Sequence, residues 1–145
     1  MSWRIETGLS ESERTTVKQG LTAFAETYTG PRNYQPLELA LRDEKDIVRG
    51  GLLGNTLWNW LRIDVLWIED GARGLGLGQQ LIAAAEAEAV RRGCVSAMVD
   101  TFSFEAVDFY RKLGYRVAST TKDFPEGFDH VHLLKDLRSE APPQP

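Results

Sequence analysis

Closely spaced glycines mark the segment of this sequence whose residue types most directly suggest chemistry. Gly74, Gly76 and Gly78 alternate with leucines immediately after Arg73. An apolar stretch precedes them and a helix-like stretch follows, and backbone amides at the start of a helix attract anions, phosphate above all. Glycines leave those amides open to close approach, and the arginine adds a positive charge beside them. The pattern therefore predicts a phosphate-binding turn, with a turn that merely allows close packing as the alternative.

The spacing of these glycines disfavours the two commonest nucleotide-binding motifs. A dinucleotide fingerprint has Gly-x-Gly-x-x-Gly near the first strand and an acidic residue about twenty positions later. Here the glycines occupy every second position, the turn follows the fourth expected strand, and no second half of such a domain remains, although Asp100 does end the next strand. A phosphate P-loop needs Gly-Lys-Ser or Gly-Lys-Thr, whereas Gly78 is followed by Gln79 and Gln80. Both nucleotide-binding interpretations are therefore weak.

The elements that must position this turn follow from the apolar spacing, the capping residues and the placement of glycine and proline. Strands are expected at Trp3–Thr7, Leu37–Arg42, Ile47–Trp58, Trp60–Ile68, Val95–Asp100, Tyr115–Thr121 and His130–Leu134. Helices are expected after a Ser10–Glu13 capping box up to Gly30, from the glycine-rich turn to about Arg92, and from about Glu105 to Leu113. This order predicts a mixed α/β domain over residues 1–138, followed by a disordered tail over residues 139–145.

Composition and charge exclude several other classes of function. A chain of 145 residues is typical of one compact domain. Its net charge is −4 and its Lys and Arg residues are interleaved with acids, which argues against nucleic acid as a partner. No apolar run is long enough to span a membrane and no signal pattern begins the chain, so we expect no membrane association and a cytoplasmic location.

Residues that bind metals are sparse in this sequence. The single cysteine, Cys94, permits neither an internal disulfide nor a cysteine-based metal site, and it is expected to be a small core residue. His130 and His132 alternate on an expected strand and therefore face the same side. Two imidazoles alone do not make up a structural zinc site, so no metal is expected.

Two motifs in a fixed order give the sequence a family resemblance. The first motif, Arg/Gln-x-x-Gly-x-Gly/Ala behind an apolar strand end, is met by Leu66-Trp67-Ile68, Arg73, Gly76 and Gly78. The second, an alanine and a tyrosine four residues later followed by Gly-Phe/Tyr, is met by Ala106, Tyr110, Gly114 and Tyr115. In these motifs the chain resembles the GCN5-related N-acetyltransferase (GNAT) superfamily over about residues 3–137. Asp70 and Ser103 depart from the pattern, because the family often has a proline and an asparagine there.

The resemblance implies a fold and a cosubstrate. The implied fold is a single α/β domain with a mixed, mostly antiparallel sheet that is flanked by helices and splayed between strands 4 and 5. Acetyl-coenzyme A would lie in the splay, with its pantetheine along the strand backbone and its pyrophosphate on the turn amides. The cofactor-binding residues implied in this way are Leu66, Trp67, Ile68, Arg73, Gly74, Leu75, Gly76, Leu77, Gly78, Ser103 and Ala106.

The resemblance also implies transfer of the acetyl group to a primary amine of a small molecule or peptide. This reaction needs a neutral amine and a proton for the departing thiolate. Tyr110 is the expected acid, because a phenol carries its proton at neutral pH, with a packing role as the alternative. Asp64 is the expected base, because it interrupts the apolar strand Trp60–Ile68, which is expected to be buried on both faces, and burial raises the pKa of a carboxylate.

Alternatives to these roles remain open at this point. Asp64 is equally compatible with a structural ion pair; Glu69 and Asp100 are further candidates for the base, and a base is dispensable if water takes the proton. Asn33 and Tyr34 lie in the region that the family uses for substrate contacts. A module that binds acyl-coenzyme A without turnover is the main alternative function. The sequence does not specify the acceptor. Because many members of the family dimerise, the resemblance also implies a possible homodimer.

Overall fold

The computed structural model describes residues 1–138 and divides into two compact units. The first unit covers Met1–Arg32 and the second begins at Asn33. The tail predicted over residues 139–145 lies outside the described residues. None of the helices in the described part of the chain is long and apolar enough to cross a membrane.

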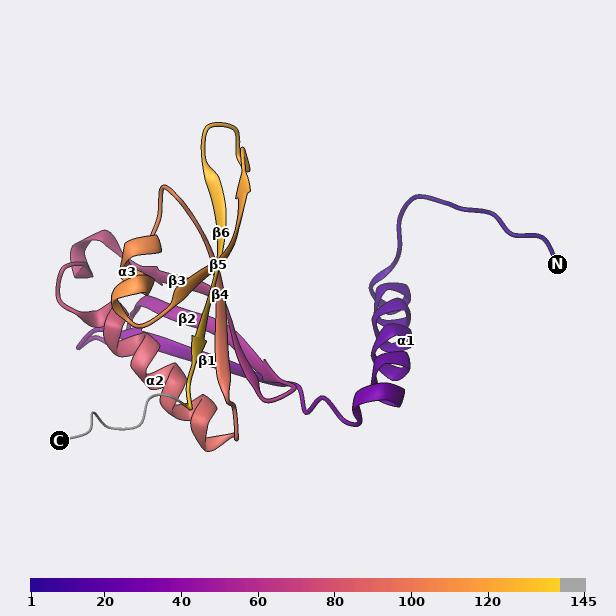
Figure 1. Ribbon diagram of the computed structural model, residues 1–145, viewed down its shortest axis with the longest axis horizontal. Coiled ribbons are helices and arrows are strands. Elements are labelled where there is room, and N and C mark those ends of the chain that lie inside the picture. Colours follow the sequence, from indigo (N-terminus) through magenta and orange to yellow (C-terminus); the bar gives the residue numbers. More distant parts are fainter. Residues whose placement is uncertain (139–145) are drawn as a thin grey trace. The chain divides into compact units, whose positions relative to one another are not determined.

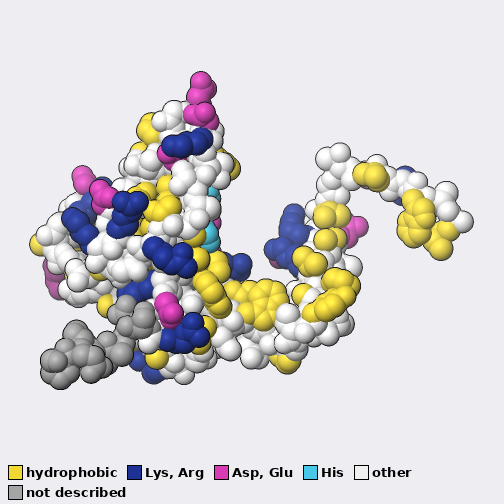
Figure 2. All heavy atoms as spheres, viewed as in Figure 1, with side chains coloured by type: hydrophobic (Ala, Val, Ile, Leu, Met, Phe, Trp, Pro, Cys, Tyr) yellow, Lys and Arg dark blue, Asp and Glu magenta, His cyan; other side chains and the backbone are white. Residues whose placement is uncertain are grey.

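The first unit consists of an irregular segment and one helix, α1 (Glu11–Thr29). The capping box is confirmed: the Ser10 side chain accepts from the amide of Glu13 at 3.2 Å, and the Glu13 carboxylate accepts from the amide of Ser10 at 2.8 Å. Gly30 ends the helix with a positive φ of 72°. The strand predicted at Trp3–Thr7 is wrong, because these residues have no strand partner and are exposed. No α1 residue is buried, and Figure 2 shows hydrophobic side chains along it.

The second unit contains a sheet of six strands, drawn in Figure 1. The strands are β1 (Gln35–Arg42), β2 (Val48–Leu57), β3 (Trp60–Ile68), β4 (Ser96–Phe102), β5 (Arg116–Lys122) and β6 (Asp129–Asp136). Their order across the sheet is β1-β2-β3-β4-β6-β5. β3 and β4 are parallel, and the other neighbouring pairs of the described sheet are antiparallel. The predicted mixed, mostly antiparallel sheet is confirmed, with β3 and β4 in place of expected strands 4 and 5.

The parallel pair β3–β4 separates early along its length. Pairing runs from Trp60↔Ser96 to Ile63↔Val99 and then stops. Beyond that point β3 continues to pair with β2 as far as Ile68, while β4 continues to pair with β6 as far as Phe102. Past Ile63 and Val99, β3 and β4 are therefore no longer paired with each other. This opens a gap in the middle of the sheet, at the predicted place.

The helix α2 (Leu77–Arg91) packs against β1, β2 and β3 and buries one face of the sheet. Figure 1 shows it running across that face. Its buried residues are Leu81, Ile82, Ala85 and Ala89, four of the five that the apolar spacing predicts. The prediction that β3 is buried on both faces is wrong within this unit. Leu61 and Ile63 face the core, whereas Arg62 and Asp64 point to the opposite face and are exposed.

A buried polar network joins α2 to β6 and to the residue that precedes β5. The Tyr115 hydroxyl donates to the Glu86 carboxylate at 2.7 Å, and the Lys135 ammonium donates to the same carboxylate at 3.0 Å. The side chains of Lys135 and Glu86 are 7% and 15% exposed. Buried charges are tolerated when they are paired in this way. The network therefore ties α2 to Lys135 on β6 and to Tyr115, which directly precedes β5.

Candidate active site

A cavity of about 1310 Å³ lies at the gap between β3 and β4. Every residue from Ile63 to Ile68 on β3 lines it, as does every residue from Val99 to Phe102 on β4. Contact with consecutive residues of both strands places the cavity between the unpaired edges of β3 and β4. The loop after β4 and the short helix α3 (Val107–Lys112) complete its wall.

The glycine-rich turn lies at the start of α2, and the short 3-10 helix η1 (Asp70–Ala72) separates it from β3. Gly76 is the N-cap of α2 with φ 75°, and no side chain caps the helix there. Gly74 also has a positive φ of 79°, and a Cβ atom at either glycine would meet open space. Amides at this end of the helix are therefore accessible to an anion. Among the turn residues the cavity lining includes Arg73 and Gly78, while Gly74 to Leu77 lie beyond it.

Gly78 differs from the other two glycines. A Cβ atom there would lie 3.3 Å from Cδ1 of Ile68 and 3.3 Å from Cζ of Phe109, and its backbone is ordinary helix. This glycine permits close packing of α2 against β3 and α3. The sequence prediction of open amides thus fits Gly74 and Gly76, and the alternative of close packing describes Gly78.

Arg73 is positioned by the backbone at the end of β3. Its Nε donates to the Ile68 carbonyl at 2.9 Å, and its Nη1 lies 3.4 Å from Oδ1 of Asp70. The side chain is 58% exposed, so the guanidinium keeps donors available at the cavity mouth. Leu66, Trp67 and Ile68 line the same cavity from β3, and the backbone groups that face the gap there have no β4 partner.

Tyr110 lies on α3, 3% exposed, and lines the cavity. Its ring packs edge-on against Phe109 at 5.1 Å and Tyr115 at 5.6 Å. Burial, and secondly the negative charge of Glu105, raise the pKa of Tyr110 to about 12. No residue in the described part of the chain forms a hydrogen bond with its hydroxyl. Tyr110 therefore holds its proton firmly and directs an unengaged hydroxyl toward the cavity.

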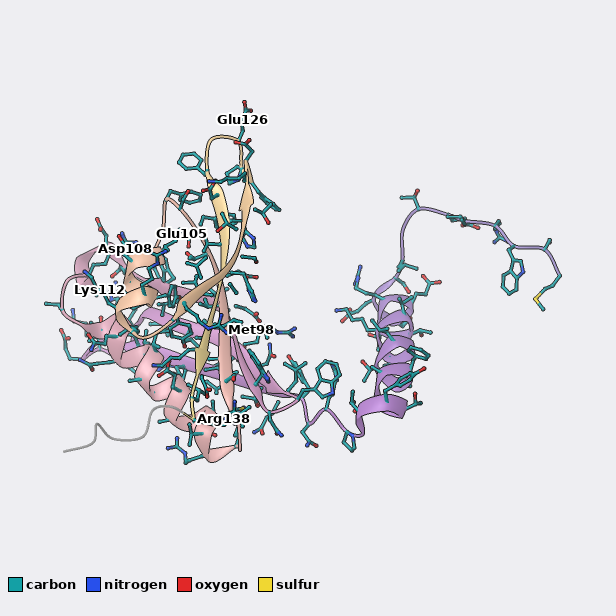
Figure 3. The ribbon with its side chains drawn as sticks, in the orientation of Figure 1. Met98, Glu105, Asp108, Lys112, Glu126 and Arg138 are labelled. Carbon is teal, nitrogen blue, oxygen red and sulfur yellow. The ribbon has the colours of Figure 1, made fainter. Side chains whose placement is uncertain are left out.

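Ser103 and Ala106 line the cavity from the loop between β4 and α3. The Ser103 hydroxyl accepts from the amide of Asp129 at 2.9 Å, which ties this loop to the start of β6. Ala106 is the N-cap of α3, and its carbonyl accepts from the amide of Tyr110 at 3.1 Å. Figure 3 places Glu105 in the same loop, beside α3.

The three carboxylates considered as bases have different surroundings. Asp64 lines the cavity, but its side chain is 53% exposed and is therefore not the buried carboxylate that the sequence predicts. Its Oδ2 accepts from the Asn55 amide at 3.3 Å, and Arg62 lies 4.0 Å away. Glu69 is bound to Arg49 at 3.2 Å and does not line the cavity. Asp100 lines the cavity from β4 and contacts His132.

Aromatic side chains form the rim of the cavity beside the β5–β6 hairpin. Phe102 stacks on Phe104 at 5.3 Å and packs against His130 at 5.0 Å, and Phe104 meets Phe128 at 5.0 Å. Phe102, Phe104 and Trp67 line the cavity. Figure 3 shows Glu126 at the tip of this hairpin.

Both predicted substrate-binding residues lie outside the cavity. Asn33 and Tyr34 precede β1 and do not line it, so their substrate role stays a prediction. Within the described residues no cluster of three or more histidine, cysteine or acidic side chains suits a metal ion. Cys94 is buried, as expected, and burial raises the pKa of its thiol.

Sequence reasoning missed the contact between Asp100 and His132 and the continuity of the aromatic rim. Both depend on pairing β4 with β6, whose partners are about thirty residues apart. The alternation of His130 and His132 was the available signal, since it correctly predicts that both face one side. It does not reveal which strand lies beside them.

Comparison with known proteins assigns the chain to a family. The model of the acetyltransferase (GNAT) family matches residues 6–115. The blasticidin-S acetyltransferase of Streptomyces morookaense is 45% identical over 95 residues, which cover 65% of this chain and 70% of that protein. An acetyltransferase structure from Bacillus cereus superposes with a TM-score of 0.84 at 28% identity, covering 92% of this chain and 97% of that one. A Bacillus anthracis structure in complex with acetyl coenzyme A shares the fold, with a TM-score of 0.62 at 18% identity over 78% of this chain and 67% of that one.

The chain belongs to the GNAT acetyltransferase family. It is an acetyl-coenzyme A-dependent acyltransferase that transfers an acetyl group to an amine substrate. The observed site suits this cosubstrate, because an uncapped helix start beside Arg73 can hold pyrophosphate and an unpaired strand edge can hold amide groups.

Proposed function

We propose that this enzyme acetylates a primary amine of a small molecule that enters from the sheet face carrying Asp64 and Asp100, with blasticidin S as the first acceptor to test. The observation that carries the proposal is the cavity at the β3–β4 gap, which Asp64 and Asp100 both line. Acetyl-coenzyme A occupies the α2 and α3 side, and the amine meets the thioester through the gap. The identity to a blasticidin-S acetyltransferase supports the choice of acceptor.

The cosubstrate is held by three groups of residues in this proposal. The amides from Gly74 to Gly78 and the guanidinium of Arg73 bind the pyrophosphate. The β3 backbone at Leu66, Trp67 and Ile68 binds pantetheine, because the edge of β3 that faces the gap has no strand partner within the described sheet. Ser103 and Ala106 contact the cosubstrate from the opposite wall.

Tyr110 gives its proton to the departing thiolate. The phenol carries its proton at neutral pH, as this role requires. The hydroxyl also lies at the cavity, where a ligand atom can accept from it.

The acceptor side favours a cation with an apolar body. Asp64 and Asp100 supply negative charge, and Trp67, Phe102 and Phe104 supply apolar contact area. An ammonium is attracted to both kinds of group. Contacts from Asn33 and Tyr34, assembly into a homodimer and a cytoplasmic location stay predictions.

Release of free thiol from acetyl-coenzyme A in the presence of blasticidin S tests the function. The expected result is acceptor-dependent thiol release together with a product that is 42 Da heavier, about the mass of one acetyl group in place of a hydrogen. A panel of polyamines, amino acids and peptides run in parallel ranks other amines. Calorimetric binding of acetyl-coenzyme A without thiol release for any amine would instead support a non-catalytic binding module.

A further inference from the structure

The face of the sheet that carries Asp64 and Asp100, from which the amine is proposed to enter, is called the acceptor face. Asp100 and His132 form the closest pair of ionisable side chains on it. β4 and β6 are antiparallel with Asp100 directly opposite His132, so the two side chains lie on the same face. His132 Nδ1 lies 2.5 Å from Asp100 Oδ1. The imidazole is 33% exposed and the carboxylate 55% exposed. Figure 2 shows histidine side chains at the surface of this unit.

The second carboxylate oxygen of Asp100 is available. Its Oδ2 lies 3.9 Å from Nε2 of His130, which is beyond hydrogen-bonding distance. Among the residues that the structure describes, the hydrogen bond of this carboxylate goes to His132 alone. Asp64 differs in this respect, since Asn55 binds its Oδ2 and Arg62 lies beside it.

Asp100 also stands at the point where the sheet opens. The last paired residues of β3 and β4 are Ile63 and Val99, so Asp64 and Asp100 are the first residues past the pairing on either side of the gap. Asp100 lines the cavity, whereas His130 and His132 lie behind it. A carboxylate placed there faces the amine as it approaches the thioester from the acceptor face.

We propose that Asp100 takes the proton from the acceptor ammonium and that His132 is the positioning residue that holds it. This rests on the acceptor face proposed above. His132 donates Nδ1–H to Oδ1, which fixes the carboxylate and leaves Oδ2 for the ammonium. Asp64, which has the Arg62 guanidinium 4.0 Å away, attracts the cation from the other side of the gap.

The proton and electron balance of the step is simple. Asp100 Oδ2 takes one proton from the ammonium, and the freed lone pair of the nitrogen forms the C–N bond to the thioester carbonyl carbon. The C–S bond breaks, its electron pair stays on sulfur, and the thiolate takes the Tyr110 proton. The nitrogen loses its second proton to the Tyr110 oxygen, and Asp100 releases its proton to water. The net reaction converts an ammonium and a thioester into an amide, a thiol and one proton.

The test compares Asp100→Asn with two matched controls, His130→Gln and Asp64→Asn, using thiol release with blasticidin S. Asp100→Asn should lower kcat/KM by about 10²-fold or more, as expected for a lost general base, while the calorimetric affinity for acetyl-coenzyme A stays within about twofold. His130→Gln, next to the same carboxylate, should stay within about threefold of wild type. Asp64→Asn should chiefly raise KM, because it removes attraction and no proton acceptor.

The role of His132 is separated from a merely structural one by a conservative rescue. Asn places an amide donor near the position of Nδ1, so His132→Asn should retain most of the activity, and His132→Leu should lose about tenfold or more. Equal activity of the two variants would overturn the positioning role. An Asp100→Asn enzyme with wild-type kcat/KM would overturn the proposal and leave the acetyltransferase function standing.

A readout that needs no acceptor keeps the two proposals apart. Nitrogen NMR of the wild-type protein should show the His132 proton on Nδ1, and Asp100→Asn should abolish that preference. An unprotonated Nδ1 in the neutral imidazole would refute the arrangement, even if blasticidin S proved not to be the acceptor. Absence of turnover with blasticidin S, with the NMR result as expected, would refute only the acceptor, and the kinetic series would then use the best amine of the panel.

Discussion

Loss of the hydroxyl should lower kcat at one of two neighbouring tyrosines of this enzyme and lower the stability of the fold at the other. Tyr110 and Tyr115 are each 3% exposed, and their rings pack against each other at 5.6 Å. The Tyr110 hydroxyl faces the cavity, whereas the Tyr115 hydroxyl donates to the Glu86 carboxylate at 2.7 Å. Tyr110→Phe and Tyr115→Phe remove the same atom from similar rings and form a matched pair.

The magnitudes follow from these partners. A hydrogen bond to a charged group contributes about 1.5–3 kcal/mol, so Tyr115→Phe should lower the free energy of unfolding by that amount. At roughly 4 °C per kcal/mol for a domain of this size, Tm should fall by about 6–12 °C. Tyr110→Phe breaks no protein hydrogen bond in the described structure and should leave Tm nearly unchanged. Its kcat should fall by about 10²-fold, as for a lost general acid, with little change in acetyl-coenzyme A affinity.

Thermal unfolding and steady-state thiol release measured on both variants decide the matter. A Tyr110→Phe enzyme with wild-type kcat would refute the role of Tyr110 as acid. Equal loss of kcat in both variants would indicate that ring packing, and not the proton, limits the reaction. Because the pKa of Tyr110 is about 12, no alkaline decline of the rate from this residue is expected well below that pH.

The same raised pKa has a consequence for stability at high pH. A tyrosine in the unfolded chain ionises near pH 10, while folded Tyr110 keeps its proton to about pH 12. Between these values the unfolded state binds fewer protons, so stability should decline as the pH rises through this window. Below it, Tyr110 should contribute no pH dependence, and Tyr110→Phe should reduce the decline.

Three further substitutions test other parts of the structure. Gly76→Val should abolish calorimetric binding of acetyl-coenzyme A, since it puts a branched side chain at a φ of 75° beside the proposed pyrophosphate; unchanged affinity would remove that assignment. Gly78→Val should instead destabilise the fold by about 1–3 kcal/mol, seen in urea unfolding, because its Cβ would press on Phe109 at 3.3 Å. Glu86→Ala should cost about 3 kcal/mol, because it removes the carboxylate facing buried Lys135, and a wild-type unfolding midpoint would contradict the network's role.

Local features of the fold were predictable because their causes lie within a few residues. The Ser10–Glu13 box and the buried stripe of α2 depend on contacts three or four positions apart. The strand expected at Trp3–Thr7 failed for the complementary reason. Its apolar alternation is local, but a strand also needs a partner, and none lies beside these residues in their unit.

The faces of β3 and the surroundings of Asp64 required knowledge that a single sequence does not hold. An apolar run such as Trp60–Ile68 is equally typical of a strand covered on two faces and of a strand beside a large cavity. The glycine-rich turn shows the same limit at smaller scale. The spacing locates the turn, yet the roles of Gly76 and Gly78 differ, because only the folded chain brings Phe109 next to the latter.

The early separation of β3 from β4 makes this sheet two three-stranded halves joined by a short seam. β1, β2 and β3 form one half, and β4, β6 and β5 form the other; the seam between them holds from Trp60↔Ser96 to Ile63↔Val99. A cosubstrate bound in the gap, as proposed, should contact both halves and stabilise their association. Saturation at about 100 times Kd adds about 2.7 kcal/mol of stability. In hydrogen exchange this gain should be concentrated in slower exchange of the amides of Asp64–Ile68, so that occupancy of the active site and cohesion of the sheet are measured by one signal.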